Sequence, residues 1–156
     1  MANIKLLLMD CDGVLTDGRL YYSSSGEELK AFHVRDGHAI VEWHRAGNRS
    51  GIISGRSSKA VEARARELGI EFVYQGVTDK VAALNEILKA AGVDASEAAF
   101  IGDDIPDIKV MEAVGFSVAV GDAAADVKQI ADLVTEAVGG RGAVREAVEH
   151  LLKKDQ

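Results

Sequence analysis

A short apolar run followed by two aspartates and a glycine constrains this chain more than any other stretch. The run covers residues 4–9 and is interrupted only by Lys5. Because it is short and nearly continuous, it is typical of a strand buried on both faces of a sheet. Asp10 and Asp12 follow, and residues two apart in an extended chain point the same way. Gly13 then lets the backbone turn away without a side chain. We therefore expect two carboxylates that face one point at the end of a buried strand.

Two carboxylates held this close repel each other, so a shared proton or a cation is expected between them. A hard cation such as Mg²⁺ prefers oxygen ligands and keeps room for water and a phosphate group. The simpler alternative is an Asp-Gly turn with no chemistry. A D-x-D-G pattern arises by chance in roughly a few per cent of chains of this length. The weight of the pattern therefore depends on the rest of the chain.

Composition favours one domain and argues against a nucleic-acid or membrane partner. The 156 residues suffice for a single domain with a sizeable core, so we expect one domain over residues 1–156. A net charge of −7 disfavours nucleic acid or an anionic membrane as the main partner. Cys11 is the only cysteine, which excludes an internal disulfide, and no apolar run reaches the length of a membrane span. We therefore expect a cytoplasmic protein.

Strand-like and helix-like patterns alternate along the chain. Two short strand-like pieces flank a polar turn between residues 19 and 32, which predicts a small β-hairpin flap and no cap domain. Core strands are expected at 49–53, 72–74, 99–101, 116–120 and 133–134. Helices are expected to end near residues 46, 68, 91, 113, 131 and 152, and the first of them is expected to begin at Gly37. The glycines of residues 139–142 predict a flexible bend that begins a C-terminal tail, 139–156. This alternation predicts an α/β fold with a doubly wound, mostly parallel sheet.

Chemically useful side chains stand just after predicted strands or at the start of the following helix. They are Asp10, Asp12, Ser54, Gly55, Arg56, Lys80, Asp103 and Asp104. Parallel strands bring these points together along one edge of the sheet. Four carboxylates, a hydroxyl with nearby backbone N–H groups, an ammonium and a guanidinium suit a phosphoryl group bound with Mg²⁺.

These residue types predict phosphoryl transfer through an aspartate. Asp10 is expected to be the nucleophile, which forms an aspartyl phosphate. Asp12 is expected to protonate the leaving alkoxide and then to activate water. The predicted metal ligands are Asp10, Asp12, Asp103 and Asp104. The predicted phosphate-binding residues are Ser54, Gly55 and Lys80, which offset charge in the transition state.

Plainer interpretations of several of these residues stay open at this point. Asp104 and Asp107 are also charges that a helix N-terminus favours. Ser54 also fits a turn hydroxyl, and Lys80 and Arg56 also fit solvated surface positions.

Two other function classes share part of this inventory. A signalling receiver domain, a binding module phosphorylated on aspartate, also combines a doubly wound sheet, an acidic Mg²⁺ pocket, a hydroxyl and a lysine. Receivers place the acidic pair first and the lysine last, whereas here Asp103 and Asp104 come after Lys80. A catalytically inactive assembly subunit would not need the complete set. The order of the residues therefore favours an enzyme.

Four segments resemble, in order, the four motifs of the haloacid dehalogenase (HAD) superfamily: residues 10–18, residues 52–56, Lys80 and residues 102–107. Residues 32–37 and 139–146 are similar to the capless branch that contains the 3-deoxy-D-manno-octulosonate (KDO) 8-phosphate phosphatases. The resemblance spans nearly the whole chain. It implies a HAD-like Rossmannoid fold and a Mg²⁺-dependent homotetramer that acts on sugar-acid phosphates. It also implies that Asp12 binds Mg²⁺ through its backbone carbonyl.

The substrate expected from this resemblance is KDO 8-phosphate, with a nine-carbon sialic-acid-type 9-phosphate as the alternative. Both carry a carboxylate, and the predicted substrate-binding residues are the arginines Arg56, Arg141 and Arg145. With no cap domain, shelter for the site has to come from another subunit. We expect the apolar hairpins to pack together in the tetramer, and the tail of one chain to bring Arg141 or Arg145 to a neighbour's site.

Overall fold

A six-stranded parallel sheet forms the centre of the computed structural model, which describes residues 3–154 and 156. The strands are β1 (Leu6–Met9), β4 (Arg49–Ile53), β5 (Phe72–Tyr74), β6 (Ala98–Gly102), β7 (Phe116–Ala119) and β8 (Leu133–Val134). Their order is β5-β4-β1-β6-β7-β8, and every neighbouring pair is parallel. The chain thus winds outward from β1 in both directions, which is the doubly wound arrangement that the sequence predicts.

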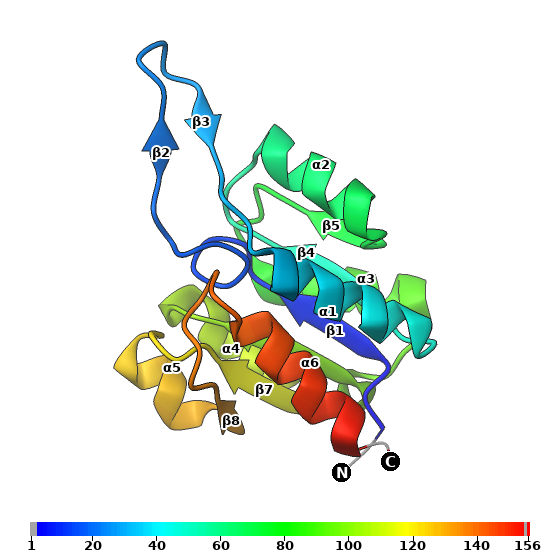
Figure 1. Cartoon of the computed structure of the whole chain (residues 1–156). Coiled ribbons are helices and arrows are strands. Elements are labelled where there is room, and N and C mark those ends of the chain that lie inside the picture. Colours follow the sequence, from blue (N-terminus) through cyan, green and yellow to red (C-terminus); the bar gives the residue numbers. More distant parts are fainter. Residues whose placement is uncertain (1–2, 155) are drawn as a thin grey trace.

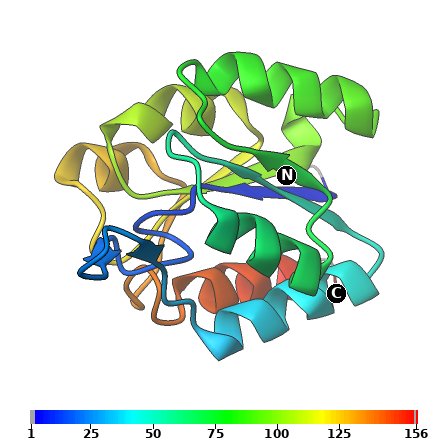
Figure 2. The ribbon, with the colours of Figure 1, turned by 90° about the horizontal axis from the view of Figure 1, so that it is seen from above.

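Helices cover both faces of this sheet (Figure 2). One face carries α1 (Val34–Arg45), α2 (Lys59–Leu68) and α6 (Ala143–Lys154), and the other carries α3 (Lys80–Ala91), α4 (Ile108–Ala113) and α5 (Ala125–Ile130). Single 3₁₀ turns precede β6 and α4, at η1 (Ala95–Glu97) and η2 (Ile105–Asp107). All four residues of β1 are buried, because helices pack on both of its faces. The apolar run of the sequence is therefore the centre of the core.

Helix α1 begins three residues before the position that the apolar pattern predicts. His33 has an extended backbone, and its Nδ1 accepts a hydrogen bond of 3.1 Å from the backbone N–H of Arg35. This side chain satisfies one of the free N–H groups of the first turn, as a helix cap does. The cap lies ahead of the apolar face, so periodicity alone placed the start too late.

A hairpin extends from the side of the sheet where β1 ends (Figure 1). Its strands, β2 (Tyr21–Tyr22) and β3 (Glu28–Leu29), pair antiparallel. Apolar side chains at Leu20, Tyr22 and Leu29 are exposed on it. No cap domain is present in the part of the chain that the structure describes, so the predicted fold class is confirmed.

The glycine-rich segment before α6 is held against the loop that follows β1. A Cβ atom at Gly139 would lie only 1.7 Å from the carbonyl oxygen of Gly13. The N–H of Gly140 donates to the carbonyl oxygen of Val14 at 2.9 Å. The buried carboxylate of Asp36 accepts from the N–H groups of Gly142 and Arg145. These glycines therefore allow close backbone contact, and the segment is not the flexible bend that composition predicts.

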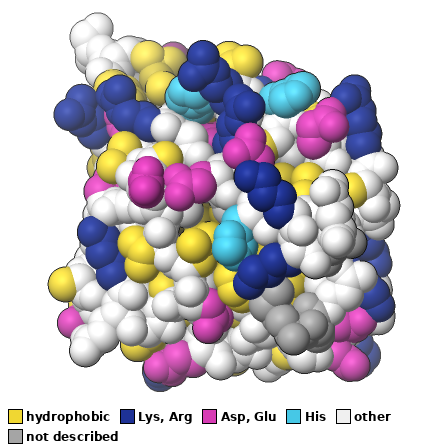
Figure 3. Space-filling model, turned by 60° about the horizontal axis from the view of Figure 1, so that its bottom comes forward, with side chains coloured by type: hydrophobic (Ala, Val, Ile, Leu, Met, Phe, Trp, Pro, Cys, Tyr) yellow, Lys and Arg dark blue, Asp and Glu magenta, His cyan; other side chains and the backbone are white. Residues whose placement is uncertain are grey.

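Charged side chains are mixed on the face around the ends of the chain. Figure 3 shows lysines and arginines interspersed with aspartates and glutamates there, and neither sign forms one continuous patch on that face. No helix within residues 3–154 combines the length and the apolar character that crossing a membrane requires.

Candidate active site

The eight residues singled out at the strand ends meet around one cavity of about 900 Å³. They are Asp10, Asp12, Ser54, Gly55, Arg56, Lys80, Asp103 and Asp104. The cavity lies at the carboxyl ends of β1, β4 and β6, where ligands bind in open α/β sheets. Arg141 and Arg145 do not line it, and the Nε of Arg145 instead pairs with Glu149 Oε1 at 2.9 Å.

Asp10 is fixed at the end of β1 by the backbone. Its Oδ1 accepts a hydrogen bond of 2.7 Å from the N–H of Cys11, and its Oδ2 lies 3.2 Å from Lys80 Nζ. Burial, followed by the negative charge of Asp107, raises the pKa of Asp10 to about 6, although Lys80 acts in the opposite direction. Asp10 thus presents one oxygen to the cavity beside a lysine ammonium.

Asp103, at the end of β6, approaches Asp10 because residue 13 is a glycine. A Cβ atom at Gly13 would lie 1.9 Å from Asp103 Oδ2, and Gly13 has a φ of +86°, which side chains rarely adopt. Asp103 Oδ1 is buried and has no hydrogen-bond partner among the described residues. Burial, followed by the charges of Asp10 and Asp107, raises the pKa of Asp103 to about 9.

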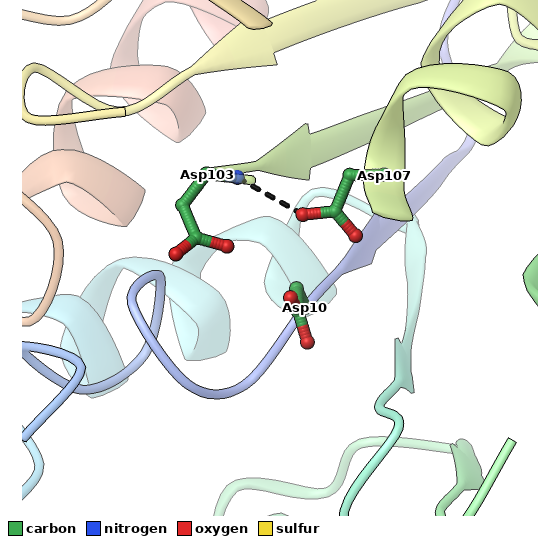
Figure 4. Close-up of side chains that lie close together, drawn as sticks. All are labelled: Asp10, Asp103 and Asp107. Atoms are coloured by element: carbon green, nitrogen blue, oxygen red, sulfur yellow. Dashed lines mark hydrogen bonds between the residues drawn. The ribbon is translucent and has the colours of Figure 1, made fainter. Parts of the chain in front are cut away.

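Asp107 is a member of this cluster that sequence analysis did not assign to the site. It is fully buried, and its Oδ1 accepts a hydrogen bond of 2.7 Å from Lys80 Nζ. Its Oδ2 accepts from the N–H groups of Asp103 at 3.0 Å (Figure 4) and Asp104 at 3.3 Å. The spacing of Asp104 and Asp107 is that of a capping box, which marks a helix start but not a buried ion pair.

The acidic cluster fits a divalent cation. Asp10, Asp103 and Asp107 each offer a carboxylate oxygen, and these oxygens lie within 4.8 Å of one another (Figure 4). Such oxygen donors are those that Mg²⁺ prefers. Asp103 Oδ1 has no partner among the described residues, and the raised pKa values of Asp10 and Asp103 indicate that Lys80 alone does not offset burial and the repulsion between the carboxylates. Both Asp107 oxygens already accept hydrogen bonds, so Asp103 has the most free ligand capacity.

Asp104 lies differently from the other predicted metal ligands. Its Oδ1 accepts a hydrogen bond of 2.8 Å from the N–H of Ile105, and the residue is exposed at the rim of the cavity. It is not part of the cluster of Asp10, Asp103 and Asp107. In this geometry the side chain caps η2.

Asp12 faces the hairpin side of the cavity. Its Oδ1 accepts a hydrogen bond of 2.6 Å from Lys30 Nζ, and its Oδ2 lies 3.5 Å from Arg56 Nε. Lys30 is also 3.0 Å from Glu28 Oε1. Burial lowers the pKa of Lys30, but hydrogen bonds to Asp12 and Glu28 outweigh burial, so the net shift is upward. No motif in the sequence marks Lys30, which reaches Asp12 only because the hairpin folds back.

The phosphate-binding candidates lie between these two sides. Ser54 is buried at the end of β4, and its Oγ lies 3.4 Å from the backbone N of Arg56, from which it accepts a hydrogen bond. Lys80 is the first residue of α3, and its side chain is only 9% exposed. Arg56 contacts Glu28 Oε1 at 3.1 Å and Tyr22 at 3.4 Å, so its guanidinium is engaged by the hairpin.

Comparisons with known proteins agree with this geometry. A family model described as haloacid dehalogenase-like hydrolase matches residues 70–147. The chain is 47% identical over 150 residues to the 3-deoxy-D-manno-octulosonate 8-phosphate phosphatase of Escherichia coli strain K12, an alignment that covers 96% of this chain and 80% of that protein.

Two solved structures are similar over nearly the whole chain. One is a 3-deoxy-D-manno-octulosonate 8-phosphate phosphatase from Moraxella catarrhalis in complex with magnesium, phosphate and KDO. Its TM-score is 0.94 and its sequence identity is 44%, and the match covers 97% of this chain and 87% of that one. The other is the corresponding phosphatase from Yersinia pestis, with a TM-score of 0.95, 47% identity, and coverage of 97% and 82%. The chain therefore belongs to the 3-deoxy-D-manno-octulosonate 8-phosphate phosphatase family of haloacid dehalogenase-like hydrolases.

Proposed function

We propose that this protein is a Mg²⁺-dependent phosphomonoesterase that hydrolyses KDO 8-phosphate to KDO and phosphate through an aspartyl-phosphate intermediate. The observation that carries the proposal is the cluster of Asp10, Asp103, Asp107 and Lys80, which opens into the same cavity as Asp12. Family membership and the names of the relatives supply the substrate.

In the first step a carboxylate oxygen of Asp10 attacks the phosphorus atom. The bond between phosphorus and the sugar oxygen breaks as the new bond to Asp10 forms. Asp12 transfers its proton to the leaving oxygen, which would otherwise depart as a high-energy alkoxide. In the second step Asp12 takes a proton from a water molecule, which attacks the aspartyl phosphate. Inorganic phosphate leaves, and the Asp10 carboxylate is restored.

Other residues of the cavity bind and orient the phosphoryl group. The Ser54 hydroxyl, the backbone N–H of Gly55 and the Lys80 ammonium would contact phosphoryl oxygens and stabilise negative charge there. Asp107 holds Lys80 in place through a 2.7 Å hydrogen bond. When bound, Mg²⁺ would be held by Asp10 and Asp103 and would supply positive charge against the phosphoryl oxygens.

The proposal extends to assembly and location. The exposed apolar side chains of Leu20, Tyr22 and Leu29 support hairpin packing in a homotetramer. In it, Arg56 and a neighbour's Arg141 or Arg145 would bind the substrate carboxylate. Light scattering tests this arrangement, and a fully active monomer at assay concentration would contradict it. The free thiol of Cys11 is compatible with the cytoplasm.

A panel of phosphate esters tests the proposed reaction. We expect Mg²⁺-dependent phosphate release with the highest kcat/KM on KDO 8-phosphate. N-acetylneuraminate 9-phosphate, with a longer sugar acid, and glucose 6-phosphate, with no carboxylate, are the comparison substrates. A higher kcat/KM on N-acetylneuraminate 9-phosphate would mean that this ester, and not KDO 8-phosphate, is the substrate. A phosphoaspartate that persists without turnover would indicate a receiver-like module.

A further inference from the structure

Lys30 is a buried cation at the foot of the hairpin. It follows β3 directly, and its side chain is only 3% exposed although neighbouring Leu29 is 59% exposed. Alternate residues of an extended strand point to the same side, so Lys30 and Glu28 both point toward Asp12 and Arg56, and Leu29 points away. Burying an ammonium costs free energy unless acidic partners and hydrogen bonds compensate it. The partners here are Asp12 and Glu28, at 2.6 and 3.0 Å.

These contacts distinguish the two oxygens of Asp12. Oδ1 accepts the short hydrogen bond from Lys30. Oδ2 has only a 3.5 Å ion-pair contact, with the Nε of Arg56, whose side chain is 44% exposed. Oδ1 is therefore held closely by the hairpin, whereas Oδ2 has the longer contact with a more exposed cation and is the oxygen available to the substrate.

Glu28 keeps this arrangement in place from the other side. Its Oε1 lies 3.0 Å from Lys30 Nζ and 3.1 Å from Arg56 Nη2. A single hairpin carboxylate thus contacts both cations that flank Asp12. The side chain of Asp12 is therefore held through the hairpin, although Asp12 and Arg56 themselves follow strands β1 and β4 of the sheet.

Building on the proposed function, we propose that Lys30 is a positioning residue for proton transfer by Asp12. It fixes Oδ1 so that Oδ2 carries the proton toward the leaving-group oxygen. As the bond between phosphorus and that oxygen breaks, the proton passes from Asp12 to the oxygen and Asp12 becomes negative. The Lys30 ammonium then faces the new carboxylate directly.

This role predicts a dependence on the leaving group. A sugar alkoxide is a poor leaving group and needs the proton, whereas p-nitrophenolate leaves without one. Loss of correct positioning should therefore reduce kcat/KM for KDO 8-phosphate much more than for p-nitrophenyl phosphate. A residue that only supports the fold would reduce both values in the same proportion.

The test compares Lys30→Met and Lys30→Arg with the unaltered enzyme on both substrates, with Mg²⁺ present. Lys30→Met should lower kcat/KM about 50-fold for KDO 8-phosphate but less than about 3-fold for p-nitrophenyl phosphate. Lys30→Arg keeps the charge and a hydrogen-bond donor, so it should recover most of the loss. Lys89→Met is the control, because Lys89 is an exposed lysine of α3 outside the cavity.

Equal losses on the two substrates, or no loss on KDO 8-phosphate, would overturn the role of Lys30. Failure of the unaltered enzyme to hydrolyse either ester would instead overturn the proposed function. Thermal unfolding of each variant checks its fold. If Lys30→Met does not fold, Lys30→Gln, which keeps one donor group, is judged by the same ratio of losses.

Discussion

The two sides of the cavity are held by different kinds of contact. On the sheet side, backbone N–H groups just after the buried strands β1 and β6 bind the carboxylates of Asp10 and Asp107. On the hairpin side, the partners of the Asp12 carboxylate among the described residues are the side chains of Lys30 and Arg56. The sheet side thus inherits the rigidity of the core, whereas the hairpin side depends on ion pairs.

This difference separates two tasks of the proposed reaction. Groups that meet the phosphoryl moiety are preorganised by the backbone, which suits stabilisation of a transition state of fixed shape. Asp12, which meets the leaving group, is instead held by Lys30 from an appendage with two-residue strands. Changes in the hairpin can therefore alter how leaving groups are handled without disturbing the sheet.

The largest effect is expected from a change on the sheet side. Asp10→Asn should leave the fold intact and lower turnover of KDO 8-phosphate at least about a thousand-fold, because an amide is a far poorer nucleophile. Asp126→Asn, which alters an exposed aspartate of α5, is the matched control and should be almost fully active. Near-normal phosphate release by Asp10→Asn would remove Asp10 from the nucleophile role.

Binding of the metal should depend on residues of the sheet side and not on those of the hairpin side. A chelator should abolish activity, and Mg²⁺ at 100 times its Kd should restore it and stabilise the fold by about 2.7 kcal/mol. Asp103→Asn should lose most of this stabilisation, whereas Glu28→Gln, on the hairpin side, should keep it. Thermal unfolding with and without Mg²⁺ measures both. Full activity after exhaustive chelation would contradict a metal role, and Ca²⁺ should support little activity because it favours looser coordination.

Stability should respond unequally to the loss of a carboxylate on each side. Asp107→Ala should lower the free energy of unfolding by about 3 kcal/mol, because it leaves two backbone N–H groups without their acceptor and the buried Lys80 with Asp10 as its remaining partner. Glu28→Ala should cost less than about 1 kcal/mol, as is usual for partly exposed ion pairs. Denaturant unfolding measures the free energy of unfolding of both variants. Similar losses in the two variants would mean that both sides contribute equally to the stability of the fold.

The smallest effect is expected on the pH dependence of stability, from His44, which lies outside both sides of the cavity. Burial lowers the pKa of His44 from its ordinary value of 6.5, and its Nε2 contacts Ser50 Oγ at 2.6 Å. The folded state therefore disfavours protonation of this ring. The contribution of the neutral His44 ring to the stability of the fold is fully present above pH 6.5. It is lost as the pH falls from 6.5 toward the lowered pKa of His44. His44→Gln should flatten the decline in stability below this pH, and an unchanged slope would assign the decline to other groups.

Sequence patterns were sufficient to find most of the sheet side. Asp10, Asp103 and Lys80 follow strands of one parallel sheet, and such strands necessarily end at a common edge. Asp107 was not predicted as a site residue because its spacing from Asp104 also fits a helix cap. Only its burial beside Lys80 distinguishes a member of the acidic cluster from a capping residue. The start of α1 was misplaced for a similar reason, since His33 caps the helix outside the apolar pattern.

The sequence by itself determined the doubly wound fold, the hairpin and the residues at the strand ends. These features follow from local periodicity and chain order, which the sequence contains directly. Only the tertiary structure decided that Lys30 pairs with Asp12 and that residues 139–142 pack against the loop after β1. Both contacts join segments distant in the chain, and neither contains a periodic signal. Their partners are selected by close approach and by the need to pair buried charge.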